Sequence, residues 1–303
     1  AKKMNMSQQG LSYKIQQFEE KKIILNYYTF IDYICFGYSG YKVLFTLQHG
    51  KKEQLDSFLK ILKQHNSIIS ITELGGNYDY MVLFAQKNAS RCIKEIHILL
   101  LQYPQLIKSY SVLTNAASYE FKRRYLTDSS SHTPSIVLGG DREQTSIDTL
   151  EIKILKTLCE NPQLSYVKIA AKYKINPKTA IAKVRALQTK GIIKGYSANI
   201  DCYTYKYLAQ KILLKTSSIS KQKDEELIKF FRQHEQIIRV SKIFGNWDYE
   251  IDVEVSSLKD FQTFCLIFRT NFGEIIEHFE AYPIIQNYVT STLPKAFFLE
   301  VKK

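Results

Sequence analysis

The chain has 303 residues and a mass of 35.3 kDa, which is long enough for two or more domains with separate cores. Its 45% hydrophobic content indicates a globular protein and argues against disorder, and it contains no run of about 18 apolar residues that would predict a membrane span. The formal net charge of +13 favours a polyanionic partner, with nucleic acid first and an acidic membrane surface second.

The cysteines and histidines indicate neither a disulfide framework nor a metal site. The five cysteines are odd in number, widely spaced and never form a Cys-x-x-Cys pair. This usage is typical of reduced thiols in the cytoplasm. The six histidines form no ligand cluster, so we expect no metal and no cofactor.

Residues 1–32 predict one helix followed by a strand. The helix covers "SQQGLSYKIQQFEEKK" and the strand lies within "KKIILNYYTFID". Residues 33–126 then alternate as strand, helix, strand, strand, helix and strand, which is the order of a ferredoxin-like module. Residues 127–146 are rich in Ser, Thr, Gly and Asp and predict a linker, in which the apolar "SIVLGG" docks locally.

Residues 147–200 predict a winged helix-turn-helix. The first helix ends at Asn161-Pro162, Ser165 caps the second, and Asn176 and Pro177 begin the third. Gly191 stops the third helix before a strand. This segment carries ten Lys or Arg and three Asp or Glu, and the outward face of its third helix combines small and cationic residues. Such a face suits entry into a DNA major groove.

Residues 201–303 repeat the ferredoxin-like order, and the repeat is visible in the sequence. "GNYDY" begins at Gly76 and "GNWDY" at Gly245, an offset of 169 that aligns the chain without a gap from residue 1 to about residue 115. The segment 147–169 has no counterpart ahead of Ala1. We therefore expect the intact protein to begin earlier or to have lost this element.

The repeated phrase predicts a tight hairpin turn. Gly-Asn supplies the backbone angles, an aromatic ring anchors the base, and Asp79 or Asp248 can accept hydrogen bonds from nearby amides. The alternative is a loop that helps to form a small-ligand pocket between paired modules.

"IDTLEIKILKTL" and "KIAAKYKINPKTAIAKVRALQTKGIIKGYSANID", together with the Gly-x-x-Asp turn, resemble the Lrp/AsnC family of regulators. The resemblance covers nearly the whole chain twice. It implies an α+β chain with two winged helix-turn-helix segments, the first truncated, and two ferredoxin-like RAM domains. It also implies a transcription factor, not an enzyme, that binds double-stranded DNA and carries its two RAM domains as a covalent pseudo-dimer able to assemble further.

Candidate site residues follow from the helix faces and from the resemblance. On the third helix of residues 147–200, the DNA-binding candidates are Lys178, Thr179, Ala182, Lys183, Arg185 and Thr189. The corresponding residues of the first copy are Gln9, Tyr13, Lys14 and Gln16, which carry less positive charge and should contribute less affinity. By the resemblance, a small metabolite such as an amino acid would bind near Gly76, Asn77, Asp79, Gly245, Asn246 and Asp248.

Two alternatives remain open at the level of sequence. Sirohaem decarboxylases resemble the same architecture, but they would need a cluster of Arg and His around a tetrapyrrole, and the histidines here are scattered. The other alternative is an effector sensor or scaffold that does not bind DNA.

Overall fold

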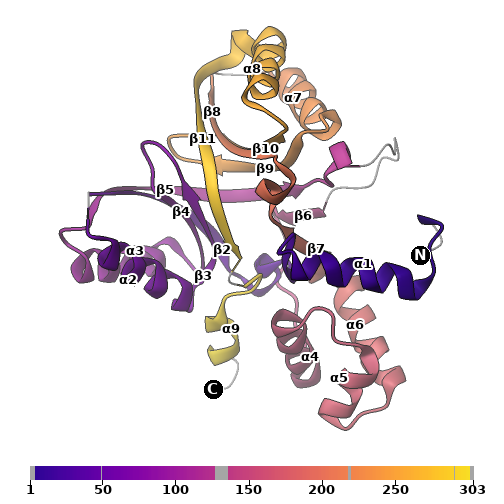
Figure 1. Ribbon diagram of the computed structural model, residues 1–303. Coiled ribbons are helices and arrows are strands. Elements are labelled where there is room, and N and C mark those ends of the chain that lie inside the picture. Colours follow the sequence, from indigo (N-terminus) through magenta and orange to yellow (C-terminus); the bar gives the residue numbers. More distant parts are fainter. Residues whose placement is uncertain (1–3, 49, 127–135, 218–219, 290, 301–303) are drawn as a thin grey trace.

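A computed structural model describes residues 4–48, 50–126, 136–217, 220–289 and 291–300 (Figure 1). The helices are α1 (Gln8–Glu20), α2 (Lys52–Gln64), α3 (Ala89–Gln102), α4 (Thr149–Glu160), α5 (Tyr166–Tyr173), α6 (Pro177–Thr189), α7 (Lys221–Gln233), α8 (Leu258–Phe272) and α9 (Lys295–Glu300). The strands are β1 (Ile24–Ile31), β2 (Ser39–Leu47), β3 (Ile68–Leu74), β4 (Tyr80–Gln86), β5 (Ile107–Glu120), β6 (Ile136–Gly139), β7 (Ile193–Ile200), β8 (Leu208–Thr216), β9 (Ile237–Phe244), β10 (Tyr249–Val255) and β11 (Ile276–Val289).

Eight antiparallel strands close into a ring. Their order is β2-β4-β3-β11-β8-β10-β9-β5, and β5 pairs back with β2. The two 14-residue strands join the halves of this ring. In β5, residues 107–115 pair with β2 and residues 114–120 with β9, while β11 pairs first with β8 and then with β3. Because the ring is closed, each of the eight strands pairs with a neighbouring strand on both of its edges.

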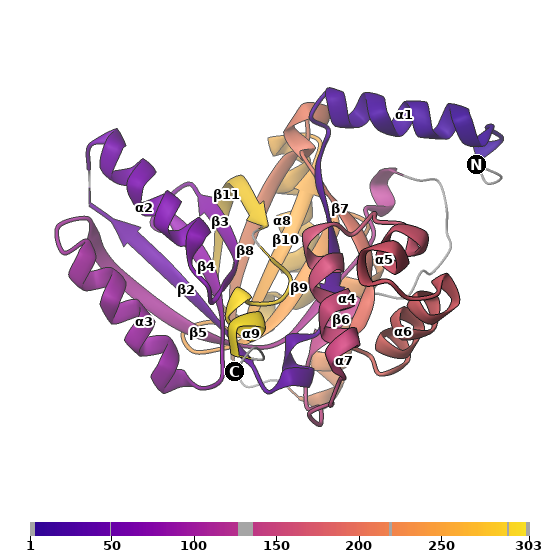
Figure 2. The ribbon, with the colours of Figure 1, turned by 90° about the horizontal axis from the view of Figure 1, so that it is seen from below.

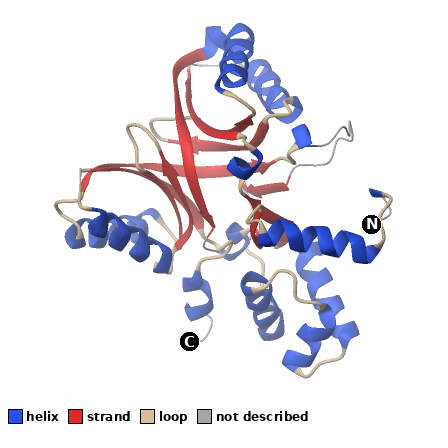
Figure 3. Cartoon of the chain, viewed as in Figure 1, coloured by secondary structure: helices blue, strands red, loops and turns tan. Residues whose placement is uncertain are grey.

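The helices cover the outside of the ring (Figures 1 and 3). α2 and α3 pack on one half, and α7 and α8 on the other, each over its own apolar core. The alternation of side chains in β10 shows why. Tyr249, Ile251 and Val253 enter the helix-side core, whereas the intervening residues point into the ring. A separate inner core fills part of the ring and includes Leu213 and Trp247.

The winged helix-turn-helix consists of α4, α5, α6 and β7. The expected helix caps are confirmed: the side chain of Ser165 accepts a hydrogen bond from the amide of Lys168, and that of Asn176 from the amide of Lys178. Gly191 has φ +70°, as its helix-stopping role requires. Its three helices share one core, made by Ile154, Leu155, Leu158, Ile169, Ala170, Ala180, Val184 and Leu187.

β1 and β7 form a separate two-stranded antiparallel ribbon. Tyr28 pairs with Ser197 at its centre, and these two positions are themselves related by the offset of 169. The ribbon connects directly to the winged helix-turn-helix, because the buried hydroxyl of Thr29 donates a 2.9 Å hydrogen bond to the carbonyl of Leu158 in α4. Figure 2 shows the ribbon between the ring and these helices.

Two features extend the expected outline. Part of the predicted linker, Ile136–Gly139, forms β6 and pairs with β5, so the apolar stretch docks locally as expected. Residues 127–135 of that linker lie outside the described residues. The short helix α9 was not anticipated; Phe297 packs against Phe36 with ring centroids 4.5 Å apart. Within the described ranges, no helix combines the length and apolar character needed to cross a membrane.

Candidate nucleic-acid interface and ligand cavity

α6 presents the candidate DNA-binding face to solvent. Its opposite face is held by Ala180, Val184 and Leu187, all buried in the core shared with α4 and α5. Because that face is fixed, the remaining positions are directed outward. The exposed candidates are Lys178, Thr179, Ala182, Arg185 and Thr189.

Lys183 differs from the other candidates on α6. Its side chain is 30% exposed, and its ammonium group is paired with Asp148, the N-cap of α4, and lies 3.9 Å from Glu151. These contacts of Lys183, on the flank of α6, link α6 to the start of α4. Lys183 therefore has a structural partner already, whereas neither Lys178 nor Arg185 takes part in an ion pair within the described ranges.

α1 carries the corresponding candidates of the first copy. Gln9, Tyr13, Lys14 and Gln16 are all exposed, and Gln16 donates a 2.9 Å hydrogen bond to Glu20. None of the residues of α1 is buried, and the helix projects from the side of the ring opposite α2 and α3 (Figures 1 and 2). The helices α4, α5 and α6, in contrast, share one buried core.

The hairpin residues at Gly76–Asp79 and at Gly245–Asp248 stabilise their turns in the same way. Gly76 and Gly245 have φ of +124° and +137°, which confirms the predicted turn geometry. The carboxylate of Asp79 accepts a 2.6 Å hydrogen bond from the amide of Leu47. The carboxylate of Asp248 accepts one of 2.8 Å from the amide of Thr216.

The two hairpins do not line the cavity described below. Asn77 and Asn246 are both exposed at the turns. Neither they nor the hairpin glycines and aspartates belong to its lining. The suggested effector site at the hairpins stays a prediction.

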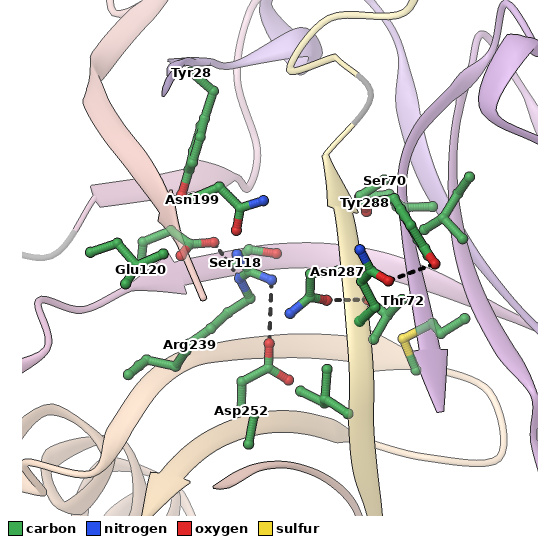
Figure 4. A pocket seen from close by; sticks show the side chains of 18 of the residues that line it. Tyr28, Ser70, Thr72, Ser118, Glu120, Asn199, Arg239, Asp252, Asn287 and Tyr288 are labelled. Carbon is green, nitrogen blue, oxygen red and sulfur yellow. Dashed lines mark hydrogen bonds and ion pairs between the residues drawn. The ribbon is translucent and has the colours of Figure 1, made fainter. Parts of the chain in front are cut away.

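A cavity of about 390 Å³ lies between the β1–β7 ribbon and the inner face of the ring (Figure 4). Its lining comes from nearly every strand, including β1, β3, β5, β7, β9, β10 and β11. This volume is in the range of small-molecule sites in proteins. Its lining mixes apolar residues such as Ile31, Leu83 and Ile284 with polar residues gathered in two groups.

The first polar group is a network of buried ion pairs. Glu250 is bonded to both Lys42 and Lys211, and Lys211 also contacts Asp252 at 2.6 Å. Arg239 pairs with Glu120 at 2.5 Å and with Asp252 at 3.3 Å. Arg123 forms two hydrogen bonds with Glu254, of 2.7 and 2.9 Å. Each cation of this wall is thereby paired with a carboxylate.

The electrostatics of the wall follow from this pairing. Burial raises the pKa of Glu250, but the ammonium groups of Lys211 and Lys42 outweigh burial and hold that pKa well below its ordinary value. Burial lowers the pKa of Arg239, and Glu120 and Asp252 more than compensate, so the pKa is raised. Glu250 and Arg239 are therefore charged at neutral pH, whereas burial and the neighbouring Lys211 lower the pKa of Lys42 despite its pairing with Glu250.

The second polar group is uncharged. Asn199 of β7, Asn287 of β11 and Ser118 of β5 all line the cavity (Figure 4). Thr72 donates a 2.9 Å hydrogen bond to the amide oxygen of Asn287. This leaves the NH₂ group of Asn287 and the whole amide of Asn199 directed at the cavity.

Sequence reasoning missed this cavity, although one signal was present. Glu250, Asp252 and Glu254 alternate along β10, so three carboxylates share its inward face. The positions offset by 169 in β4 hold Met81, Leu83 and Ala85. Charged side chains on the inward face of a strand require buried partners. The carboxylates of β10, compared with the apolar residues of β4, therefore indicate a polar site in the half of the ring that contains β10. No group of three potential metal ligands occurs among the residues the structure describes.

The whole chain shares its fold with an enzyme. The crystal structure of the siroheme decarboxylase NirDL in complex with an iron-uroporphyrin III analogue matches 100% of this chain and 91% of that one, with a TM-score of 0.61 and 11% sequence identity. A second NirDL structure matches equally well, at 12% identity. The expectation that the chain is not an enzyme is therefore wrong: the Lrp-like sequence features on which it rested are also compatible with a fold that carries catalysis.

The cavity lining does not fit a tetrapyrrole of that kind. A uroporphyrin bears carboxylates around its whole rim, and these require unpaired cations. Here the lining cations Lys42, Arg123 and Arg239 are each held by a carboxylate, and no histidine belongs to the lining. The shared fold therefore does not by itself make this cavity a tetrapyrrole site.

Sequence comparisons point to regulators. A model of the winged helix-turn-helix DNA-binding family matches residues 147–194. The HTH-type transcriptional regulator YezC of Bacillus subtilis is 28% identical over 120 residues, covering 39% of this chain and 82% of YezC. The Bkd operon transcriptional regulator of Pseudomonas aeruginosa is 26% identical, covering 39% of this chain and 78% of that protein. The Leucine-responsive regulatory protein of Haemophilus influenzae is 22% identical over 40% of this chain and 74% of its own length. The chain therefore contains a winged helix-turn-helix domain of the DNA-binding kind and has homologues among Lrp-type regulators over about 39% of its length.

Proposed function

We propose that the protein is a sequence-specific transcriptional regulator of the Lrp/AsnC type that contacts double-stranded DNA through α6. The observation that carries this proposal is the exposed outward face of α6 on a complete winged helix-turn-helix. Lys178 and Arg185 supply cations for phosphates and guanine edges, and Ala182 permits close approach to the groove. The net charge of residues 147–200, with ten basic and three acidic side chains, is of the sign that DNA requires.

The arrangement of the ring supports a pseudo-dimer within one chain. The order β-α-β-β-α-β occurs from β2 to β5 and again from β8 to β11, and the two groups pair through β3–β11 and β9–β5. These equivalent contacts are what two paired RAM domains would make, with the linker raising their effective concentration. We infer that such pseudo-dimers assemble further, as the resemblance to Lrp/AsnC regulators implies.

A salt titration of DNA affinity tests the proposal. Binding of the intact chain to genomic DNA fragments and to one selected duplex is measured by fluorescence anisotropy between about 50 and 200 mM salt. Affinity should fall steeply with salt, because binding to each phosphate releases counterions. Lys178→Ala and Arg185→Ala should each weaken binding and reduce the magnitude of the salt slope by about 1 for each phosphate that the variant no longer neutralises.

Gln9→Ala and Gln16→Ala serve as matched controls on α1. They remove exposed polar side chains at corresponding helix positions without changing charge. We expect much smaller losses of affinity from them. Affinity that does not respond to salt, or equal losses from the α1 and α6 variants, would contradict the assignment of α6 as the DNA-contacting helix.

A further inference from the structure

We propose that the cavity beneath the β1–β7 ribbon binds one uncharged heterocyclic molecule of the nucleobase or nucleoside class. This deepens the proposed function by supplying its small-molecule site, yet binding to the cavity does not require DNA. The site is distinct from the hairpin turns, whose residues do not line it.

The charge of the cavity excludes polyanions. Its lining contains three cations, all paired, and five carboxylates: Glu120, Asp201, Glu250, Asp252 and Glu254. Lys211, just behind the wall, is held by Glu250 and Asp252. An anionic ligand would have to displace a buried carboxylate from its partner, which leaves that carboxylate uncompensated. A phosphate or a polycarboxylate is therefore disfavoured, while a neutral molecule disturbs no pair.

The uncharged polar groups provide both donors and acceptors. With its oxygen accepting from Thr72, Asn287 keeps its NH₂ group as a donor toward the cavity. Asn199 offers both an amide oxygen and an NH₂ group. One oxygen of Glu120 accepts from Arg239, and the other is an additional acceptor at the same side of the cavity. A ligand with neighbouring donors and acceptors along one edge, as in a nucleobase, satisfies these groups.

The remaining surface suits a flat apolar body. Tyr28 of the ribbon extends toward Asn199 (Figure 4), and Ile31, Leu83 and Ile284 line other parts of the cavity. Burial, together with the nearby carboxylate of Glu120, raises the pKa of Tyr28, so its phenol stays protonated and remains a donor. Aromatic and branched aliphatic side chains contact ring faces without requiring charge.

The residues on the two sides of the cavity differ chemically, and this difference favours one ligand bound in one orientation. Asn287 occupies the position offset by 169 from Ser118, and Asn199 the position offset from Phe30. Arg239 likewise stands where the first half has Ser70. The amides and the ion pairs therefore define a direction across the cavity, although the order of strands and helices is the same in the two halves of the ring.

Isothermal titration calorimetry without DNA tests the inference. The probes are adenosine, guanosine, cytidine, uridine and their free bases, each nucleoside compared with its 5′-monophosphate. We expect at least one neutral probe to bind with 1:1 stoichiometry, and its monophosphate to bind at least tenfold more weakly. Asn199→Leu and Asn287→Leu should each weaken binding roughly tenfold or more, because each replaces a hydrogen-bonding amide by an apolar group of similar size.

Asn77→Leu is the matched control at the exposed hairpin turn and should leave binding unchanged. Thermal unfolding of each ligand-free variant verifies its fold, and Asn199, on the partly exposed ribbon, provides a readout if Asn287→Leu is unstable. The inference is overturned if no neutral probe binds at millimolar concentration, if a monophosphate binds as tightly as its nucleoside, or if only the Asn77 variant loses binding. If the protein binds a nucleoside but does not bind DNA, the proposed function is refuted and the inference about the cavity stands.

Discussion

Replacement of Glu250 by Met should show how much the buried network contributes to stability. Met81 occupies the corresponding position in β4, so a methionine side chain is compatible with the inward face of such a strand. In the variant, Lys211 keeps Asp252 at 2.6 Å, whereas Lys42 keeps only the hydroxyl of Ser241 at 2.8 Å. An ammonium group that is 5% exposed would then lack a counter-charge. We expect destabilisation of about 3–5 kcal/mol, the usual cost of breaking a buried pair.

Removing the partner as well should recover most of this loss. The double variant Lys42→Met, Glu250→Met leaves the Lys211–Asp252 pair and fills the space with two apolar side chains. Substitution of a whole buried pair is often close to neutral, so the double variant should be more stable than Glu250→Met by about 2 kcal/mol or more. Urea unfolding can be followed by fluorescence of Trp247, the single tryptophan, which is buried in the inner core of the ring.

The control and the refuting result are both specific. The exposed pair of Lys221 and Glu225 on α7, 3.9 Å apart, should give no measurable coupling in the same double-mutant cycle. If the stability changes of Lys42→Met and Glu250→Met simply add, then Lys42 does not depend on Glu250. The description of the wall as a network of obligatory pairs would then be incorrect.

Three further outcomes follow from the structure. Because Glu250 has a pKa below its ordinary value of 4.5, its contribution to the free energy of unfolding is complete above pH 4.5 and is lost as pH falls through the folded-state value. Urea unfolding at pH 7 and pH 3 should therefore show a smaller stability difference between the wild type and Glu250→Met at pH 3. An unchanged difference would contradict the lowered pKa. Burial raises the pKa of Cys92 and Cys202 to about 12, so iodoacetamide at pH 8 should alkylate neither thiol before unfolding, as read by peptide mass spectrometry; rapid native alkylation would show that they are accessible. Gly245→Ala should lower the free energy of unfolding by about 1–3 kcal/mol, since the turn has φ +137° and a Cβ would lie 2.8 Å from the side chain of Leu113. Gly140→Ala is the control, because a Cβ at that position meets no such contact. Equal urea midpoints for the two variants would exclude a steric contribution from Leu113.

Local features of the fold were predictable because their causes lie close together in sequence. Asn176 followed by Pro177 sets the start of α6 through one side-chain hydrogen bond and one fixed φ angle. In the same way, a glycine at φ above +120° and an aspartate that accepts an amide hydrogen bond explain both hairpins. Propensity and spacing are sufficient for such elements.

Closure of the ring and formation of the cavity could not be read from such local rules. The pairing of β11 with β3 joins residues more than 200 positions apart, and it exists only because β11 is long enough to leave its own half. Asn199 and Asn287 both line the cavity because the ribbon from one region lies over the end of that long strand. Nothing in the immediate sequence of either asparagine distinguishes it from an ordinary polar strand position.

The cavity and the DNA-binding domain are joined by elements that belong to both. Tyr28 lines the cavity, and the next residue, Thr29, holds the carbonyl of Leu158 at the C-terminal part of α4. At the other end, Thr292 lines the cavity and is followed by Leu293, which is buried in the core that contains α4, α5 and α6. A shift of the ribbon would therefore alter the hydrogen bond from Thr29 to α4, and a shift of the C-terminal segment would alter the core that α4 shares with it. Coupling requires a ligand to favour one arrangement of these contacts over another, and the shared residues are where that difference would arise.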